Sequence, residues 1–497
     1  MPKNKANQYI LALDCGTTGN RAIIFDSKLR IKAQAYQEFT QYFPESGWVE
    51  HDAEEIWLSV KKVIKAALKK CPQNKLTSMG ITNQRETLVI WDKQTGQPAM
   101  RAIVWQCRRT TDLCMRMKKK GLDKKLHQKT GLFLDPYFSG SKIKWAVEKY
   151  PKLKQGLQSG RLLLGTIDTW IIWKLTQGQS YVTDPTNASR TLLFDIHKGA
   201  WDKDLCRLFK APIKYLPSVL PSCGIFGKTS KKTIGIELII AGVAGDQQAA
   251  AFAQGCSPQG VVKNTYGTGL FVMADTGFRA KIAPDLVTTI AASDNKRLKY
   301  AIEGSVFVGG SAIQWLRDGL QIIQSASQSE SIAKQLPDNQ DLYFVPALAG
   351  LGCPHWDPNA RGLLIGMTRR TNQAHVVRAA LESMAYQTRD VLEVLNRKLK
   401  LPIKRLRVDG GAAANNWLMQ FQADVLGCEV ERPKIIETTA LGAVALAGIA
   451  SGVWKDQKDF LTHIKIDKVF KPKMTATQRN RLYAKWTEAV KRSLNWA

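Results

Sequence analysis

Residues Leu11–Arg21 read LALDCGTTGNR: an apolar run, an aspartate, a Gly-Thr-Thr-Gly turn and a cation. The flanking residues predict two strands, Tyr9–Asp14 and Arg21–Asp26, joined by this turn. Glycine lets backbone N–H groups approach an anion and threonine adds hydroxyl donors, so the turn suits a phosphate, although a hairpin with a polar turn explains the same residues. It is neither a P-loop nor a dinucleotide fingerprint, because no Gly-Lys-Ser/Thr follows it and the Gly-x-Gly-x-x-Gly spacing is missing.

A second stretch, NTYGTGLFVMADTG at Asn264–Gly277, repeats the order of strand, Gly-Thr turn and strand. Gly16 and Gly267 lie about half of the 497-residue chain apart. This spacing predicts two related α/β domains, each of which contributes a turn to one cleft; chance recurrence of a common turn is the alternative. The boundary is expected near the turn-rich AQGCSPQG, which gives domains over residues 1–254 and 255–497.

Strand and helix patterns alternate along the chain, which is typical of the α/β class. Residues 56–70 and 375–400 follow a helical template, and SMGIT, LIIAGVA and residues 404–408 predict strands. Polar residues follow each of these strands, at the edge where α/β proteins bind ligands. The run Ala440–Gly452 falls short of the ~20 apolar residues that a spanning helix needs, so its small residues predict a helix packed closely against a sheet or another helix.

Composition excludes several classes of protein. The nine cysteines form no Cys-x-x-Cys motif, and the six histidines form no ligand-like cluster. We therefore expect neither a disulfide framework nor a zinc site. This cysteine usage suits a protein of the reducing cytoplasm. The polar N-terminus does not resemble a signal peptide, and no membrane insertion is expected. The net charge of +30 raises the question of nucleic acid, but the cations are dispersed, and the densest run, Lys118–Lys125, has no interleaved aromatics. We therefore expect no dedicated nucleic-acid partner; a field that attracts anionic substrates such as nucleotides is compatible with the charge, and so is a compositional bias of the lineage.

Two aspartates at predicted strand ends are candidates for chemistry. Asp14 beside the phosphate-type turn could hold Mg²⁺, with Arg21 neutralising a phosphoryl group, or it could cap the turn. Asp246 stands where a strand becomes a helix, which suits either an N-cap or a general base that accepts a proton from a substrate hydroxyl.

Two further sets of residues suit small-molecule ligands. Arg85 and Glu86 offer charged partners for hydroxyls, with Trp105 and Tyr137 as flat faces for a carbon skeleton; an exposed ion pair and core aromatics are the alternatives. Gly-rich turns at 267–269, 309–310 and 410–411 allow a nucleotide to approach the backbone, unless these glycines serve turns or tight packing.

Ten motifs occur in one order along the chain: DCGTTGNR, GITNQRET, VWQCRR, DPYFSGSKIKW, VTDPTNASRT, GVAGDQQAA, KNTYGTG, SAIQWLRD, RVDGGAAANN and TALGAVALAG. Together, from about Ile10 to Trp454, they resemble the glycerol-phosphorylating members of the FGGY carbohydrate kinase family. The resemblance implies two duplicated actin-like ATPase (ribonuclease H-like) domains that flank a catalytic cleft. It also implies phosphorylation of glycerol to sn-glycerol 3-phosphate with ATP and Mg²⁺, by a cytoplasmic homodimer or homotetramer.

The same resemblance implies a role for each motif residue. Asp246 is the expected catalytic base, and Asp14 and Asp246 are the expected carboxylates at the metal. The first domain binds polyol and phosphate, and the second binds nucleotide. The implied glycerol ligands are Arg85, Glu86, Trp105, Tyr137, Asp246 and Gln247, and the implied nucleotide ligands are Thr17, Thr18, Arg21, Thr268, Gly310, Gln314, Gly411 and Asn415.

Three alternatives stay open. Another FGGY kinase, such as a pentulose kinase, would share the fold, the ATP site and the base. An actin- or chaperone-like ATPase without a small-molecule acceptor would share only the phosphate turns. A nucleic-acid binder would account only for the net positive charge of the chain. The chain departs from the usual family pattern at Cys15, Gly19, Asn20, Cys353 and His355.

Segment 227–242 leads to a first prediction. It reads GKTSKKTIGIELIIAG and lacks the Gly-rich, Arg-bearing loop that binds fructose 1,6-bisphosphate in some bacterial relatives. We expect weak or absent regulation by this sugar, measured as the initial rate of glycerol phosphorylation against its concentration. Clear inhibition at cellular concentrations would contradict the prediction.

Overall fold

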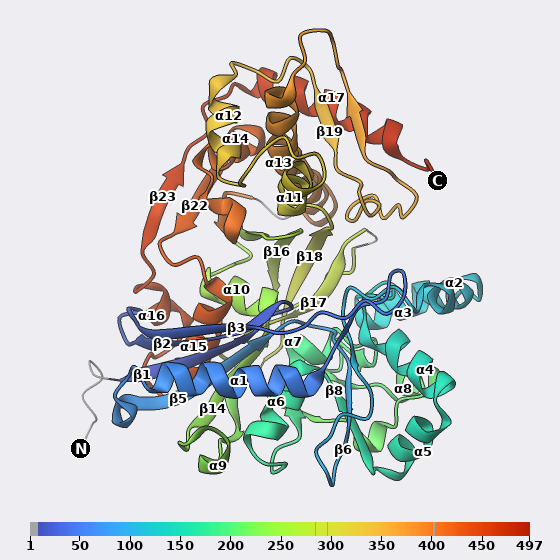
Figure 1. Cartoon of the computed structure of the whole chain (residues 1–497), viewed down its shortest axis with the longest axis vertical. Helices are drawn as coiled ribbons and strands as arrows, with labels where there is room; N and C mark the ends of the chain where they lie inside the picture. The colour runs from blue at the N-terminus through green and yellow to red at the C-terminus, as the bar shows by residue number, and fades with distance from the viewer. Residues whose placement is uncertain (1–7, 284, 296, 401–402) are drawn as a thin grey trace.

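The computed structural model describes residues 8–283, 285–295, 297–400 and 403–497. Two lobes, each built on a mixed β-sheet with helices around it, lie one above the other (Figure 1). The first sheet has the order β13-β14-β5-β1-β2-β3 and the second the order β17-β18-β16-β15-β21-β22-β23.

The strands of the first sheet are β1 (Tyr9–Cys15), β2 (Gly19–Asp26), β3 (Ile31–Glu38), β5 (Leu76–Asn83), β13 (Cys223–Lys228) and β14 (Ile239–Gly245). Those of the second are β15 (Val261–Tyr266), β16 (Leu270–Gly277), β17 (Val287–Ala291), β18 (Lys299–Val306), β21 (Arg405–Asp409), β22 (Glu429–Pro433) and β23 (Ile466–Phe470).

The two sheets repeat one five-stranded unit. Strands β1 and β2 form an antiparallel hairpin, β3 pairs antiparallel with β2, and β5 and β14 continue the sheet parallel to β1. In the same order and directions, β15 and β16 form a hairpin, β18 pairs with β16, and β21 and β22 run parallel to β15. The predicted duplicated α/β architecture is confirmed, as are both predicted hairpins.

A largely helical region is inserted between β5 and β14 and lies at the lower right of Figure 1. It carries Trp105, Tyr137 and Arg190, so it brings three side chains to the first sheet from outside that sheet. Its helices are α2 (Thr111–Lys119), α3 (Leu122–Thr130), α4 (Ser139–Lys149), α5 (Pro151–Ser159), α6 (Ile167–Leu175), α7 (Pro185–Ala188) and α8 (Lys203–Leu208). Helix α9 (Lys231–Ile234) lies outside this region and connects β13 to β14. Two short strands, β6 (Val89–Asp92) and β8 (Leu162–Gly165), pair within it.

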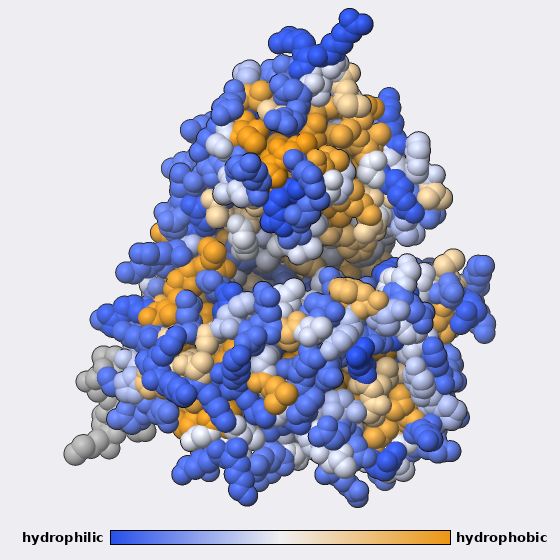
Figure 2. Space-filling model, viewed as in Figure 1, coloured by the Kyte–Doolittle hydropathy of each residue, from blue (hydrophilic) through white to orange (hydrophobic). Residues whose placement is uncertain are grey.

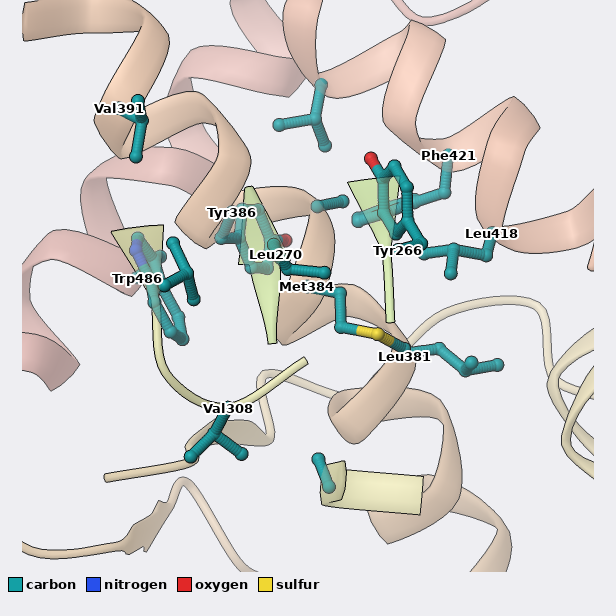
Figure 3. Packing of buried hydrophobic residues seen from close by; sticks show 14 of the residues in the cluster. Tyr266, Leu270, Val308, Leu381, Met384, Tyr386, Val391, Leu418, Phe421 and Trp486 are labelled. Atoms are coloured by element: carbon teal, nitrogen blue, oxygen red, sulfur yellow. The ribbon is translucent and has the colours of Figure 1, made fainter. Parts of the chain in front are cut away.

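Each sheet has its own apolar core. Helix α1 (Ala53–Leu68) packs on the first sheet through the apolar stripe that its sequence predicts, including Ile56, Val60 and Ile64. Helices α13 (Gln373–Leu399) and α14 (Asn416–Leu426) cover the second sheet, and α17 (Ala476–Ser493) packs against α14. Tyr266 and Leu270 of the sheet share one core with Met384, Phe421 and Trp486 (Figure 3). In the space-filling view the exposed face is mostly hydrophilic, in keeping with dispersed charge, and the lobes meet at an indentation (Figure 2).

Helix α15 (Thr438–Ala450) belongs to the second half of the chain but packs on the first sheet. It lies against β1, β5 and β14, and also against α10 (Asp246–Ala253). The contact is so close that a Cβ on Gly80 would overlap the carbonyl of Ala443, and one on Gly442 would overlap the carbonyl of Ala249. The predicted small-residue packing helix is confirmed, and none of the described helices has the length and apolarity to cross a membrane.

This packing predicts whether a Gly→Ala substitution in α15 stabilises or destabilises the protein. In an unpacked helix Gly→Ala stabilises by about 1 kcal/mol, but an extra methyl group in a filled site typically costs ~1–3 kcal/mol. We expect Gly442→Ala to lower the melting temperature in calorimetry. At Gly362 a Cβ would lie an ordinary 3.4 Å from Leu348 Cδ2, so Gly362→Ala is the control and should leave it nearly unchanged. A Gly442→Ala protein that melts at or above the wild-type temperature would contradict the packing argument.

Candidate active site

Three parallel strands of the first sheet end together and carry polar residues at that edge. The registers pair Asp14 with Thr82 across β1 and β5, and Gly245 with Asn83 across β14 and β5. The segment that follows β5 therefore lies between Asp14 and Asp246. The Nε of Arg85 lies 3.0 Å from Oδ1 of Asp246, so two of the predicted site motifs meet as expected.

Arg85 and Glu86 belong to a buried ring of four charged side chains, which we call the charge ring: Arg85, Glu86, Arg190 and Glu303. Arg85 Nη1 lies 2.5 Å from Glu303 Oε2, and Arg190 Nη2 lies 2.9 Å from Glu303 Oε1. Arg190 Nε lies 2.5 Å from Glu86 Oε1. All four residues are at most 3% exposed, so the alternative of an exposed Arg-Glu pair is wrong.

The charge ring sets the protonation of its members. Burial alone raises the pKa of Glu303, but the charges of Arg190 and Arg85 outweigh it and bring the pKa down to about 2. Burial alone lowers the pKa of Arg85, and the charge of Glu303 reverses this and holds it well above its usual value. The arginines therefore hold Glu303 in its charged form, whereas burial raises the pKa of Glu86 although Arg190 and Arg85 oppose this rise.

Asp246 sits in the first turn of α10, where Gly245 and not Asp246 is the N-cap. Its Oδ1 forms an ion pair with Arg85 Nε and accepts a hydrogen bond from the backbone N–H of Gln247 at 2.7 Å. Among the described residues no group bonds the other oxygen, Oδ2, and the side chain is 30% exposed. This arrangement leaves one carboxylate oxygen open to accept a proton.

Two aromatic rings stand beside Arg85, and neither is in the core. The rings of Trp105 and Tyr137 make an edge contact with centroids 5.6 Å apart, and Phe271 of β16 lies 6.3 Å from Trp105. Arg85 Nη2 donates to the Tyr137 hydroxyl at 3.3 Å. Both rings are half-buried, so they line one side of the site.

The opening turn meets the N-terminal end of α15. Arg21 Nη1 pairs with Glu437 Oε1 at 3.0 Å, and the Thr439 hydroxyl donates to Asp14 Oδ2 at 2.9 Å. Burial raises the pKa of Asp14 to about 6, the Thr439 hydrogen bond opposes this rise, and the charge of Asp246 adds to it. Trp105 Nε1 donates to the Thr17 hydroxyl at 2.9 Å, which ties the turn to the aromatic side of the site.

Two glutamine amides bind backbone carbonyls of the turn, and a buried imidazole contacts one of these amides. Gln84 Nε2 donates to the Gly16 carbonyl at 3.1 Å, and Gln41 Nε2 donates to the Thr17 carbonyl at 3.0 Å. His51 Nε2 lies 2.7 Å from Gln41 Oε1, and burial lowers the His51 pKa to about 4, so the imidazole is neutral. The hydrogen bonds of Gln84 and Gln41 to the Gly16 and Thr17 carbonyls thus stabilise the conformation of the turn.

The Gly-rich turns of the second half gather at one end of the second sheet. The Gly310 N–H donates to the Gly267 carbonyl at 2.9 Å and the Gly309 N–H to the Thr268 carbonyl at 2.8 Å. A Cβ on Gly410 would lie 2.5 Å from the Tyr266 carbonyl, whereas one on Gly411 would have no heavy atom within 4 Å. Gly310 and Gln314 both lie on α11 (Gly310–Asp318), directly after this turn.

Asn415 already has structural partners. Its Oδ1 accepts from the Leu418 N–H at 2.9 Å as the N-cap of α14, and its Nδ2 lies 3.4 Å from the Ser329 hydroxyl of α12 (Gln328–Gln335). The side chain thus stands beside Gly411 but is bonded to protein in this structure.

A buried lysine links Gln247 to the second sheet. Lys263 Nζ, in β15, donates to Gln247 Oε1 at 2.5 Å and also contacts the Thr265 hydroxyl. The residue is fully buried, and burial lowers its pKa. Because Lys263 binds the amide oxygen of Gln247, the amide nitrogen Nε2 points away from the second sheet.

Sequence reasoning did not single out several of these residues: Glu303, Arg190, Lys263, Glu437, Thr439, Gln84, Gln41 and His51. One signal could have found Lys263 and Glu303, since each is a charged residue in the interior of a strand. A buried lone charge needs a partner of opposite sign or a hydrogen-bonding group.

The structure shows the surroundings of the residues that depart from the family pattern. A Cβ on Gly19 would lie 2.7 Å from the Gln37 carbonyl, so glycine fits there, and Asn20 Nδ2 donates to the Ile56 carbonyl at 3.2 Å. Cys15 is buried within β1. Cys353 Sγ lies 3.5 Å from the Asp285 carbonyl, and His355 Nε2 lies 3.8 Å from Asp390 Oδ2.

Two family models match consecutive parts of the chain. The N-terminal domain of the FGGY family of carbohydrate kinases matches residues 9–253, and the C-terminal domain of that family matches residues 262–451. Glycerol kinase 2 of Thermotoga maritima is 51% identical over 493 residues, which covers 98% of this chain and 99% of that protein. Glycerol kinase of Petrotoga mobilis is 51% identical over 492 residues, with 98% and 99% covered.

Solved structures agree with the sequence comparisons. The crystal structure of Plasmodium falciparum glycerol kinase with ADP is 34% identical, with a TM-score of 0.91 and 98% of each chain covered. Gluconate kinase of Lactobacillus acidophilus, 22% identical with 97% of each chain covered and a TM-score of 0.88, shares the fold. With both family domains matched in order along the duplicated sheets, the chain belongs to the FGGY family of carbohydrate kinases.

Proposed function

We propose that this chain is a glycerol kinase, which transfers the γ-phosphoryl group of ATP to glycerol to give sn-glycerol 3-phosphate. The observation that carries the proposal is the edge of the first sheet. There a buried arginine and glutamate, two half-buried aromatic rings and a carboxylate with an open oxygen adjoin the phosphate-type turn. Relatives that are about half identical over nearly their full length bear this name.

The polyol site follows from the chemistry of glycerol, which offers three hydroxyls and an apolar C–H face. Charged donors and acceptors bind hydroxyls strongly, and flat rings cover C–H groups. In the proposal Arg85, Glu86 and Tyr137 bind hydroxyls together with Asp246 and Gln247, while Trp105 covers the carbon skeleton. Because Lys263 holds the Gln247 oxygen, the Gln247 amide N–H groups are left for the substrate.

The nucleotide site uses turns from both lobes. We assign residues 1–254 to the polyol- and phosphate-binding domain and residues 255–497 to the nucleotide-binding domain. The open space at Gly411 and the clustered turns of the second sheet support the second assignment. The proposed nucleotide ligands are Thr17, Thr18, Arg21, Thr268, Gly310, Gln314, Gly411 and Asn415.

Mg²⁺ fits the carboxylates at this edge. This ion takes one or two protein carboxylates and fills its remaining positions with water and phosphate oxygens. Asp14 and Asp246 are such a pair, since the buried Asp14 carboxylate is destabilised in its charged form by burial and by Asp246. These residues would hold the ion, which would supply charge neutralisation on the phosphates.

The transfer itself needs little covalent chemistry from the protein. Asp246 accepts the proton of a terminal glycerol hydroxyl. The oxygen of that hydroxyl attacks the γ-phosphorus in line while the bond from this phosphorus to the bridging oxygen breaks, and ADP leaves. Arg85 at Oδ1 orients the Asp246 carboxylate, and the two Gly-Thr turns position the phosphates. Positioning and electrostatics thus supply most of the acceleration. The proposal includes a cytoplasmic homodimer or homotetramer without a dedicated nucleic-acid partner.

The base assignment predicts a large loss of turnover in Asp246→Asn. Removing a general base typically costs ~10²–10⁴-fold in rate, so we expect kcat to fall by about that factor in a coupled assay for ADP. Asp202→Asn changes an aspartate at the N-terminus of a distant helix, α8, and is the control for loss of helix-end contacts. An Asp246→Asn enzyme that keeps more than roughly a tenth of wild-type kcat would exclude the base role.

The aromatic side of the site predicts the acceptor preference. Glycerol should have the highest kcat/KM in a panel with xylulose, gluconate and erythritol. Losing a well-packed apolar contact costs ~10–200-fold in kcat/KM, so Trp105→Leu should raise KM for glycerol strongly and KM for ATP little. If a pentulose is the better acceptor, the substrate is wrong; if ATP turns over equally fast without acceptor, the kinase assignment is wrong.

A further inference from the structure

The charge ring joins the two lobes through a single carboxylate. Arg85, Glu86 and Arg190 belong to the first lobe and its insertion, whereas Glu303 lies in the middle of β18 in the second sheet. The Glu303 carboxylate therefore reaches from the second lobe into the proposed polyol site of the first.

Each oxygen of Glu303 has a different arginine. Oε2 lies 2.5 Å from Arg85, a proposed polyol ligand, and Oε1 lies 2.9 Å from Arg190. Arg190 in turn lies 2.5 Å from Glu86, the other charged polyol ligand. Glu303 thus contacts one ligand directly and the second through one intermediate. Ser305 donates to Oε1 at 3.1 Å and helps to fix the carboxylate.

The arrangement is costly as a purely structural feature. Four charges are removed from water, and Arg190 Nη1 is buried without a hydrogen-bond partner among the described residues. Buried ion pairs contribute little net stability, and apolar residues of similar volume serve as well or better. What the ring does achieve is orientation, because a planar guanidinium held at several nitrogens has one allowed placement.

Glu303 also separates two like charges. Arg85 and Arg190 both face its carboxylate, and each lowers the stability of the other's charge. If the carboxylate is neutralised, the two guanidinium groups repel each other in a site of low dielectric constant. Arg85 would then move away from Asp246 or Tyr137, and Glu86 would lose its fixed partner.

We propose that Glu303 is a positioning residue for polyol binding: with Arg190 it orients Arg85 and Glu86, so affinity for the polyol depends on a side chain of the nucleotide-side lobe. This inference rests on the polyol-binding roles proposed above. It adds two residues, Glu303 and Arg190, that do not touch the substrate in the proposed site.

The chain supplies a matched control. Glu431 of β22 is also a buried carboxylate whose two oxygens pair with two arginines, at 3.0 Å from Arg405 and 2.9 Å from Arg407. It lies in the same sheet as Glu303 but has no contact with the proposed polyol ligands among the described residues. Glu303→Gln and Glu431→Gln therefore each remove a carboxylate charge that two arginines share, although the arginines at Glu431 are partly exposed and those at Glu303 are buried.

The experiment measures KM for glycerol and for ATP, kcat, and glycerol binding by calorimetry without nucleotide. A ligand displaced by 1 Å can cost on the order of 100-fold in activity, so we expect Glu303→Gln to raise KM and Kd for glycerol by about tenfold or more. KM for ATP should stay within about twofold of wild type, and Glu431→Gln should leave glycerol KM unchanged even if its melting temperature falls.

A second variant keeps the test decisive if Glu303→Gln does not fold. Arg190→Lys retains the charge but loses the fork that reaches Glu86 and Glu303 together, and we expect the same selective rise in glycerol KM. A folded Glu303→Gln or Arg190→Lys enzyme with wild-type glycerol KM and Kd overturns the inference, as does an equal rise in the Glu431→Gln control. A wild-type enzyme that does not phosphorylate glycerol overturns the proposed function instead.

Discussion

Helix α15 crosses β1, β5 and β14 at a separation that glycine and alanine allow and larger side chains do not. This helix follows β22, the last parallel strand of the second sheet, and packs on the first sheet. Its packing therefore joins the two lobes. The close approach also places Glu437 and Thr439 beside the opening turn, against Arg21 and Asp14. The contacts of Asp14 and Arg21 with this end of α15 therefore depend on a close approach between residues such as Gly80, Gly442 and Ala443, which carry no polar side chain.

Electrostatics completes the site that packing brings together. The edge of the first sheet gathers Asp14, Asp246, Glu86 and Glu303 against Arg85 and Arg190, with much of this charge out of reach of water. In such surroundings each charge is kept by its partners, and geometry follows from that pairing. The same residues that stabilise one another also fix where hydroxyl donors and acceptors point. A preorganised site of this kind needs little rearrangement when a small polyol binds.

Much of the fold could be predicted from short-range patterns. The two Gly-Thr hairpins, the α/β alternation and the small-residue helix follow from spacing and residue size, and the structure confirms them. Asp14, Arg85 and Asp246 each follow an apolar strand, which predicts a place at the ligand-binding edge of an α/β sheet, and the structure places all three at one edge. The opening stretch, ambiguous as an isolated hairpin, became a candidate phosphate turn through its counterpart half a chain away.

The sequence by itself determined the duplicated architecture, the strand-end site and the family, because these depend on local periodicity and on motifs that stay contiguous. Only the tertiary structure decided that Glu303 and Lys263 reach the proposed polyol site, that Arg190 from the insertion closes the charge ring, and that the Arg85–Glu86 pair is buried. These partners are separated by up to 218 positions in the chain, so no spacing rule relates them. Their contacts arise where two lobes and an insertion fold against each other, and burial then makes each charge depend on the others.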